Sequence, residues 1–469
     1  MNPPVVSTQA APHTSIMALQ AHRHREAPTT ADIVTALARD VAPDRIRTDR
    51  LATFAVDGVV PSVVVRPAHP DEAAGALARC NDLHAAVVPR GGSTQMLLGN
   101  LPKHVDVVLD TTALNEIVAY TPADLTLGVQ AGTTLEAVQA RLRLNGQHLP
   151  LDPPFAECAT IGGLTATNMS GPRRVASGSL RDLVIGTEVA GTDGTITKSG
   201  GMVVKNVTGY DIHKAHIGAL GTLGLLTRIN LKVAPLPANE RTVVYCFTSA
   251  LEASAAVGSI VSAPITPTAV DIVDSRLVSA VDTPDCPWLL AVRVSGSEVG
   301  VTAQADALHD ALASDSHRIQ SIEGAAQQVF WREAVSAAEP PPDGSSHVVC
   351  RISSLSSQIG SLLASAGDIA TGHGLDWRAE AHAINGVGRV RLTGTATGAL
   401  VAAVRDLRDT ASTFDAAIVV EAAPVDVKRD IDVWGVNPKS TIMDTARALR
   451  LAFDPNHTLN PGRFVADLT

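Results

Sequence analysis

A short loop of chemically active backbone follows an apolar segment in the first quarter of the chain. Residues 85–88 are apolar, and they lead into Pro89, Arg90, Gly91, Gly92, Ser93 and Thr94. Where two glycines leave no side chain in the way, consecutive backbone N–H groups form a concave anion site that hydroxyl groups can extend. A pyrophosphate group would suit such a site. Two adjacent glycines also occur in ordinary tight turns, so the loop alone leaves both interpretations open.

A second chemical signal is the excess of glycine in residues 160–233. Thirteen of the 36 glycines lie between Thr160 and Gly224. Glycine is selected where φ must be positive or where a ligand touches the main chain, and it weakens the interiors of helices and strands. We therefore expect a large polar ligand along this backbone.

The common nucleotide-binding signatures are absent. No GxGxxG follows a strand and no GxxxxGK[ST] occurs, since Gly218, Gly221 and Gly224 form only a GxxGxxG. A Rossmann or P-loop fold is therefore disfavoured.

The cysteines offer no metal or cluster site. They are odd in number and lack the spacing of zinc or iron–sulfur ligands, which predicts reduced thiols in a cytoplasmic protein. They are Cys80, Cys158, Cys246, Cys286 and Cys350.

Charge and hydropathy exclude further classes of function. Lys and Arg total 37 against 47 Asp and Glu, and no basic cluster with interleaved aromatics occurs, so a nucleic-acid surface is not expected. No apolar run approaches the roughly 20 residues that span a bilayer, and the N-terminus does not resemble a signal peptide. We expect a cytoplasmic protein, peripheral to the inner membrane only through a partner.

The elements that position the glycine segments form the first half of the chain. Residues 1–27 read as a mobile extension, and a short Thr-capped helix begins near Thr30. Residues 62–90 then give strand, turn, helix and strand, followed by a buried strand near 105–112 and a helix over about 134–144. We assign residues 28–237 to one ligand-binding domain.

The pattern changes after the Pro-Leu-Pro at 235–237. Two strand–helix–strand sets follow, separated by the proline-rich loop AAEPPPDGSS. They predict an antiparallel sheet with helices on one face, so residues 238–440 form a second domain and 441–469 a C-terminal segment. The fold class is α+β.

Several motifs occur together in a particular order, and the set carries more weight than any member. They are VVPRGGST, VQAGTTL, LPLDPP, ATIGGLTATNMSGPRR, GSLRDLVIGTEV, VVKNVTGYDIHK, IGALGTLGLLT and FDPNHTLNPGRF. The set resembles the FAD-binding family of vanillyl-alcohol oxidase and its relatives (PCMH-type), and within it most resembles the flavin-binding E-type subunits of bacterial glycolate oxidases. The resemblance implies a flavin domain of two α/β subdomains and a ferredoxin-like, antiparallel cap that binds substrate.

The resemblance also implies which residues hold FAD. The loop from Pro89, through the backbone of Arg90 to Thr94, would bind the pyrophosphate, and Gly132 would let the chain approach the cofactor. The flavin ring and ribityl chain would lie against Pro153, Pro154, Thr160, Gly162, Gly163, Thr167 and Gly171. The rest of the cradle would be Ser179, Arg181, Asp182, Gly221 and Leu223. The alternative for Arg181 and Asp182 is a solvent-exposed ion pair that contributes little to stability.

We expect the FAD to be noncovalent. Relatives that tether flavin through the glycine loop do so from a histidine, and this loop reads GGSTQ. Cys158 lies near the ring in this mapping, but a lone cysteine is more often a small buried apolar group.

The reaction implied by the family is oxidation of a small 2-hydroxy acid. Such a reaction needs a base for the hydroxyl proton and a cation for the carboxylate, and His382, Arg332 and Arg351 in the cap are the candidates. A lone strand histidine is more often structural.

One departure from the family weakens the expectation that this chain catalyses the reaction alone. Catalytic D-type relatives carry a metal-binding HxGDGNxH block and an EHG segment, and this chain has neither, so no metal is expected. Two hypotheses remain: an oxidoreductase acting on glycolate or D-lactate, or a flavin-bearing assembly and electron-relay subunit. Either implies a D-type flavoprotein and an iron–sulfur subunit as partners.

The C-terminal FDPNHTLNPGRF reads first as a pair of turns that ends a helix over 440–451. In the family this tail returns to the flavin domain, and the resemblance implies that Asn460 reaches the flavin ring.

Overall fold

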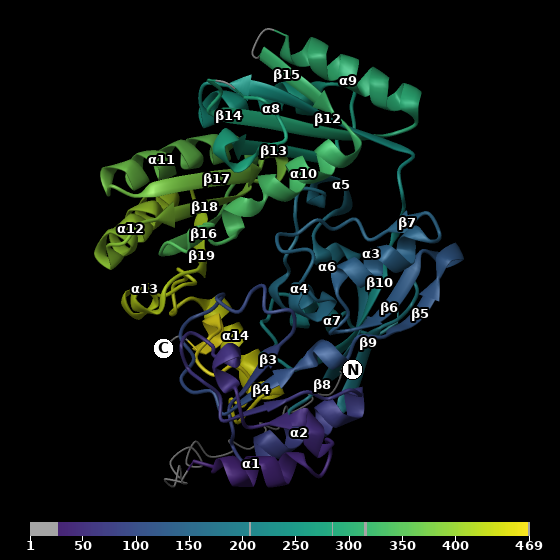
Figure 1. Ribbon diagram of the computed structural model, residues 1–469, viewed down its shortest axis with the longest axis vertical. Helices are drawn as coiled ribbons and strands as arrows, with labels where there is room; N and C mark the ends of the chain where they lie inside the picture. Colours follow the sequence, from purple (N-terminus) through teal and green to yellow (C-terminus); the bar gives the residue numbers. More distant parts are fainter. Residues whose placement is uncertain (1–26, 206–207, 284, 314–316, 468–469) are drawn as a thin grey trace, which may run out of the picture.

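The computed structural model describes residues 27–205, 208–283, 285–313 and 317–467, so the predicted extension at 1–27 lies almost wholly outside the described residues. Figure 1 shows two lobes, with the N-terminal half and the end of the chain in one and the middle of the chain in the other. Among the helices that the structure describes, none is long and apolar enough to cross a membrane.

The first subdomain is a small sheet in the order β1-β2-β4-β3, with β2, β4 and β3 parallel and β1 antiparallel to β2. Its strands are valine-rich and buried, as expected for parallel strands covered by helices. The predicted N-terminal helix is confirmed, with Thr29 and Asp32 forming a capping box. The elements are β1 (Ile46–Arg47), β2 (Val63–Val65), β3 (Val87–Arg90), β4 (Val107–Asp110), α1 (Thr30–Leu37) and α2 (Pro70–Asp82).

The second subdomain is an antiparallel sheet in the order β5-β6-β10-β8-β9, with short helices on one side. Its strands are β5 (Ile117–Thr121), β6 (Thr126–Gln130), β8 (Val184–Ala190), β9 (Ile196–Gly200) and β10 (Leu225–Lys232). Its helices are α3 (Leu135–Arg143), α4 (Ile161–Thr167), α5 (Arg174–Ser177), α6 (Leu180–Leu183) and α7 (His213–His216). A separate pair, β7 (Gln147–His148) with β11 (Ala234–Pro235), lies where the chain leaves this lobe.

The second lobe is built on an eight-stranded antiparallel sheet in the order β15-β12-β14-β13-β17-β18-β16-β19. Its strands are β12 (Asn239–Phe247), β13 (Ala269–Asp274), β14 (Trp288–Gly296), β15 (His317–Ile322), β16 (His347–Ser353), β17 (Asp376–His382), β18 (Val387–Thr393) and β19 (Ala417–Ala422). The helices α8 (Ala250–Ser262), α9 (Glu298–Leu312), α11 (Ile359–Gly372) and α12 (Thr397–Thr413) cover one face. The expectation of helices on one face alone was wrong, because α10 (Gly324–Ala334) packs on the opposite face through Phe330 and Trp331.

The two faces of this cap sheet differ sharply in polarity. Along β17, Ala379 and Ala381 join the apolar core under the helices, whereas Glu380 and His382 point the other way. Successive side chains of a strand alternate between the faces, so the sequence AEAH places both charges on one side. The same alternation in β18 puts Val390 in the core and Arg389 on the charged face.

The C-terminal segment returns to the first sheet. After α13 (Val425–Asp430) and α14 (Thr441–Phe453), Leu459 forms a parallel bridge with Val87, next to β3. The Val87 N–H donates to Thr458 O at 2.7 Å, and Asn460 N–H donates to Val87 O at 2.8 Å. In Figure 1 this yellow segment lies beside β3 and β4.

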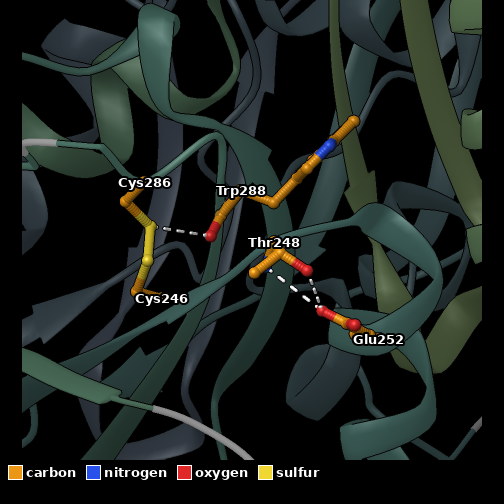
Figure 2. Close-up of a disulfide and its surroundings, with 5 residues drawn as sticks. All are labelled: Cys246, Thr248, Glu252, Cys286 and Trp288. Atoms are coloured by element: carbon orange, nitrogen blue, oxygen red, sulfur yellow. Dashed lines mark hydrogen bonds between the residues drawn. A yellow bond between two sulfur atoms is a disulfide. The ribbon is translucent and has the colours of Figure 1, made fainter.

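The prediction of reduced thiols was wrong for one pair of cysteines. Cys246 in β12 and Cys286, just before β14, form a disulfide with Cα atoms 5.7 Å apart (Figure 2). The two residues are 40 apart in sequence, and only the pairing of β12 with β14 brings them together. Cys80 and Cys350 are free and buried, whereas Cys158 is free and exposed, contrary to the expectation that it is buried.

Candidate functional site

A cavity with about 730 Å³ of empty space lies between the loop after β3, the helix α4 and the C-terminal tail. Many residues that the sequence predicted for a cofactor line it together. They are Pro89, Arg90, Gly91, Gly92, Ser93, Thr94, Thr160, Gly162, Gly163, Thr167, Gly221 and Asn460.

The two loop glycines are required by close packing. A Cβ on Gly92 would lie 1.8 Å from the Cys158 carbonyl oxygen, and one on Gly91 would lie 2.2 Å from Thr160 Oγ1. The loop therefore rests directly on residues 158–160, and Gly92 N–H donates to Thr160 Oγ1 at 3.4 Å. In this loop the positive φ lies at Ser93, where it is 64°, and not at either glycine.

The cavity wall carries donors that suit an anion. In the described part of the chain, the backbone N–H groups of Ser93, Thr94 and Gln95 have no acceptor. The guanidinium of Arg90 lies over the Phe54 ring at 4.4 Å, and its buried Nη1 has no partner there either. Free amides and an under-used guanidinium fit the pyrophosphate of FAD, since buried donors are costly without an acceptor.

Sequence reasoning missed a second arginine of this wall. Arg463 is buried, donates to Asn460 Oδ1 at 3.2 Å and to Leu98 O at 2.8 Å, and keeps its Nε without a described partner. Burial lowers the pKa of its guanidinium, and the carboxylate of Asp57 only partly offsets this. In the sequence, the one feature that could have indicated Arg463 is its position directly after the Asn-Pro-Gly turn. Asn460 is three residues away, but Leu98 is 365 residues away in the sequence, so spacing could not reveal that contact.

Other predicted cofactor residues do not line this cavity. Gly132 and Gly171 serve close packing, because a Cβ there would lie 2.0 Å from Thr111 O and 1.8 Å from Asp152 O, respectively. The residues outside the cavity wall are Gly132, Pro153, Pro154, Gly171, Ser179, Arg181, Asp182 and Leu223.

Ser179, Arg181 and Asp182 have local structural roles. Ser179 and Asp182 form the capping box of α6. Arg181 is exposed and donates to the Lys214 carbonyl at 2.6 Å, which joins α6 to α7. The structure gives no ion pair between Arg181 and Asp182, and their place in the cofactor cradle stays a prediction.

Asn460 lies in the cavity wall with its amide already bonded. Its Nδ2 donates to Leu220 O at 2.6 Å, and its Oδ1 accepts from Arg463. One N–H of the amide remains for a ligand. The predicted contact with the flavin ring stays a prediction.

A second group of functional side chains occupies the charged face of the cap. His382 Nδ1 lies 2.9 Å from Asp271 Oδ2 on the neighbouring strand and 3.9 Å from Glu380 Oε2. All three residues are fully buried. Because a carboxylate accepts hydrogen bonds, Nδ1 carries the proton, and the neutral ring then presents a bare Nε2 that has no described partner.

Arginines continue this network across the sheet. Arg389 Nη1 pairs with Glu380 Oε1 at 3.1 Å, and its Nε pairs with Glu421 at 2.8 Å. Arg351 pairs with the other oxygen of Glu421 at 2.9 Å. We call these six residues, Asp271, Glu380, His382, Arg389, Arg351 and Glu421, the cap cluster.

Electrostatics shift the protonation of the cap cluster. Burial opposes a charge on His382, but Asp271 and Glu380 outweigh burial and raise the pKa of the imidazole above its usual 6.5. Burial raises the pKa of Glu380, and His382 and Arg389 only partly offset this effect.

The same residues have the chemistry of metal ligands. One potential ligand atom from each of Asp271, Glu380 and His382 lies within 4.8 Å of the others. However, Arg389 already pairs with Glu380. Part of the negative charge that would attract a metal ion is therefore neutralised by the protein itself.

The cap cluster faces the lobe that holds the cavity, called the flavin lobe below. Arg389 Nη2 lies 3.2 Å from Met169 Sδ, two residues beyond the helix α4 that lines the cavity. Of the predicted catalytic residues, the structure therefore brings His382 and Arg351 together. It leaves Arg332 exposed in the last turn of α10.

Comparison with known proteins agrees with this geometry. Residues 61–214 match the family described as FAD binding domain. The chain is 32% identical over 224 residues to the glycolate oxidase subunit GlcD of Bacillus subtilis (strain 168), which covers 48% of this chain and 47% of that protein. It is 40% identical over 152 residues to the glycolate oxidase subunit GlcE of Escherichia coli (strain K12), covering 32% and 43%. The chain thus spans less than half the length of these curated relatives.

Solved structures show the same fold. P-cresol methylhydroxylase with substrate bound superposes with a TM-score of 0.74 at 16% identity, covering 93% of this chain and 96% of that one. Alkyldihydroxyacetonephosphate synthase gives 0.72 at 17% identity, covering 92% and 86%. The chain therefore shares its fold with these proteins. Residues 61–214 match an FAD binding domain, and FAD is the cofactor.

Proposed function

We propose that the protein oxidises a small 2-hydroxy acid, such as glycolate or D-lactate, between the flavin domain and the cap. The observation that carries the proposal is the bare Nε2 of His382, buried and without a described partner on the face turned toward the flavin lobe. Asp271 fixes the tautomer by accepting from Nδ1, which is how a carboxylate orients a histidine base. Bound FAD supplies the acceptor for the hydride that leaves the carbinol carbon.

In this proposal each residue of the cap cluster has a definite task. His382 Nε2 takes the hydroxyl proton, and Asp271 and Glu380 stabilise the imidazolium that results. Arg389 holds Glu380 in place and excludes water from this side of the ring, since both side chains are buried.

We further propose that the FAD is held noncovalently by the cavity-lining loop from Arg90 to Thr94, together with Thr160, Asn460 and Arg463. The support is the anion-binding character of the loop and the absence of a histidine from GGSTQ.

The curated relatives named as subunits support assembly into a complex. We propose a D-type flavoprotein and an iron–sulfur subunit as partners, because the cysteines of this chain have no cluster-ligand spacing. The second candidate function, a flavin-bearing assembly and electron-relay subunit, is favoured by one observation. The cap cluster is closed, with Asp271, Glu380 and His382 fully buried.

Anaerobic reduction of the flavin separates these functions. The purified FAD-bound chain is mixed with glycolate or D-lactate without acceptor, and loss of flavin absorbance is followed. We expect reduction, slowed about 10²- to 10⁴-fold by His382→Asn, the range for loss of a general base. The control His309→Asn removes an exposed cap histidine on α9 and should leave the rate unchanged. Absence of reduction by the chain alone and after addition of its copurifying partners would contradict the oxidoreductase.

A further inference from the structure

The flavin lobe contributes one more cation to the region of the cap cluster. Arg174 begins α5, which packs against β13 and against the short turn η9 (Ala383–Asn385) that follows His382. Asp271, which accepts from the proposed base, lies on β13, so the helix that carries Arg174 packs beside the strand of Asp271 and beside the turn that follows His382. Figure 1 shows α5 on the side of its lobe that is nearest the cap.

Arg174 differs from every neighbouring arginine in having no partner. Within the described ranges, its side chain forms no hydrogen bond and no ion pair. The adjacent Arg173 binds both oxygens of Glu240, at 2.8 and 2.9 Å. Arg351 and Arg389 share Glu421.

Like charges converge at this point. Burial, and then the nearby guanidinium groups of Arg389 and Arg351, lower the pKa of Arg174, and the carboxylates of Asp182 and Asp271 only partly offset this. A half-buried arginine beside two other arginines is unfavourable until an anion joins it. A planar carboxylate, which accepts two parallel N–H bonds from a guanidinium, matches it in charge and shape.

The position next to His382 restricts the kind of anion. In a 2-hydroxy acid the carboxylate and the carbinol are on adjacent carbons, so one small molecule needs a cation and a base close together. Arg174 and the bare Nε2 of His382 supply that combination across the lobe interface.

We propose that Arg174 binds the carboxylate of the substrate, an inference that rests on the proposed function. The cation comes from the flavin lobe, so the substrate is held from both lobes. Arg351, predicted from the sequence for this task, is engaged by Glu421 and Ser353, and Arg332 is exposed on α10.

The test measures anion binding directly. Oxalate, a planar analogue of the oxidised substrate, is titrated into the FAD-bound chain by calorimetry and by the perturbation of the flavin spectrum. We expect Arg174→Gln to weaken oxalate binding about 10- to 100-fold, the effect of losing charged hydrogen bonds, with unchanged FAD content. Arg174→Lys should bind with intermediate affinity, because it keeps the charge and loses the planar fork.

Arg405→Gln, at an exposed position of α12 on the other face of the cap sheet, is the matched control and should bind oxalate like the wild type. Should Arg174→Gln not fold, as judged by FAD content and melting temperature, Arg174→Lys decides: wild-type affinity overturns the proposal and weaker binding supports it.

Equal oxalate affinity in the wild type and Arg174→Gln overturns the inference even if glycolate reduces the flavin. No oxalate binding to the wild type overturns it as well. Loss of binding in Arg174→Gln, in a wild-type chain that no 2-hydroxy acid reduces, supports the anion site and contradicts only the proposed function.

Discussion

Replacing Gly92 by Ala tests the cavity at the point where its wall is tightest. The new Cβ would lie 1.8 Å from the Cys158 carbonyl oxygen, whereas real Cβ contacts stay above 3.0 Å, so the two backbone segments must separate by roughly 1.2 Å. Overpacking of this kind costs about 1 to 3 kcal/mol. If the loop moves to relieve it, the free amides of Ser93 and Thr94 leave their positions, and FAD affinity should fall about 5- to 150-fold.

Fluorescence titration of the apoprotein with FAD measures this loss, and circular dichroism of the apoprotein checks the fold. Gly398→Ala on α12 is the matched control, because its Cβ would meet nothing within 4 Å and its φ is ordinary. Its FAD affinity should equal that of the wild type. An unchanged dissociation constant for folded Gly92→Ala would refute the assignment of this loop to the cofactor.

Four further predictions use other parts of the structure. His382 must be unprotonated to act, and its pKa is raised. The rate of flavin reduction should therefore increase with pH and reach half of its maximum at a pH above 6.5. Asp271→Asn should move that value down, and a pH-independent rate would contradict the base. Chelation should leave FAD content and activity unchanged, since Arg389 already neutralises Glu380; stoichiometric zinc or manganese would contradict this. Asn460→Ala should cost about 1 to 3 kcal/mol at a buried polar site and shift the flavin spectrum or potential, whereas unaltered FAD binding after deletion of residues 455–469 would show that the tail is irrelevant. The denatured chain should show three reactive thiols before reduction and five after it, and five throughout would contradict the disulfide.

Local patterns predicted the elements well, and the parts that depend on distant pairing escaped them. The Gly-Gly-Ser-Thr loop could be found because its composition has a direct physical cause, namely backbone that must be closely approached. The alternation in AEAH likewise places Glu380 and His382 on one face. Neither pattern could name Asp271, which is 111 residues away and meets His382 only because β13 pairs with β17.

Parts of the candidate site escaped local patterns for a related reason. Motif order attached cofactor roles to Ser179 and Asp182, and only the structure shows that these residues also form a capping box. Arg174 was missed because an arginine next to another arginine has no distinctive pattern. Its lack of a partner is visible only when the lobes are assembled.

Along β17 and β18 the cap sheet separates the residues of the apolar core from charged residues on the other face. Positions such as Ala379, Ala381 and Val390 build the core, while the residues between them carry the charges. A shift of one residue in β17 or β18 would bury the charges under the helices, so the register of these strands is strongly fixed. Substitutions confined to the charged positions, by contrast, leave the apolar packing intact. The charged face along β17 and β18 can therefore be varied at every second residue without disturbing the packing under the helices.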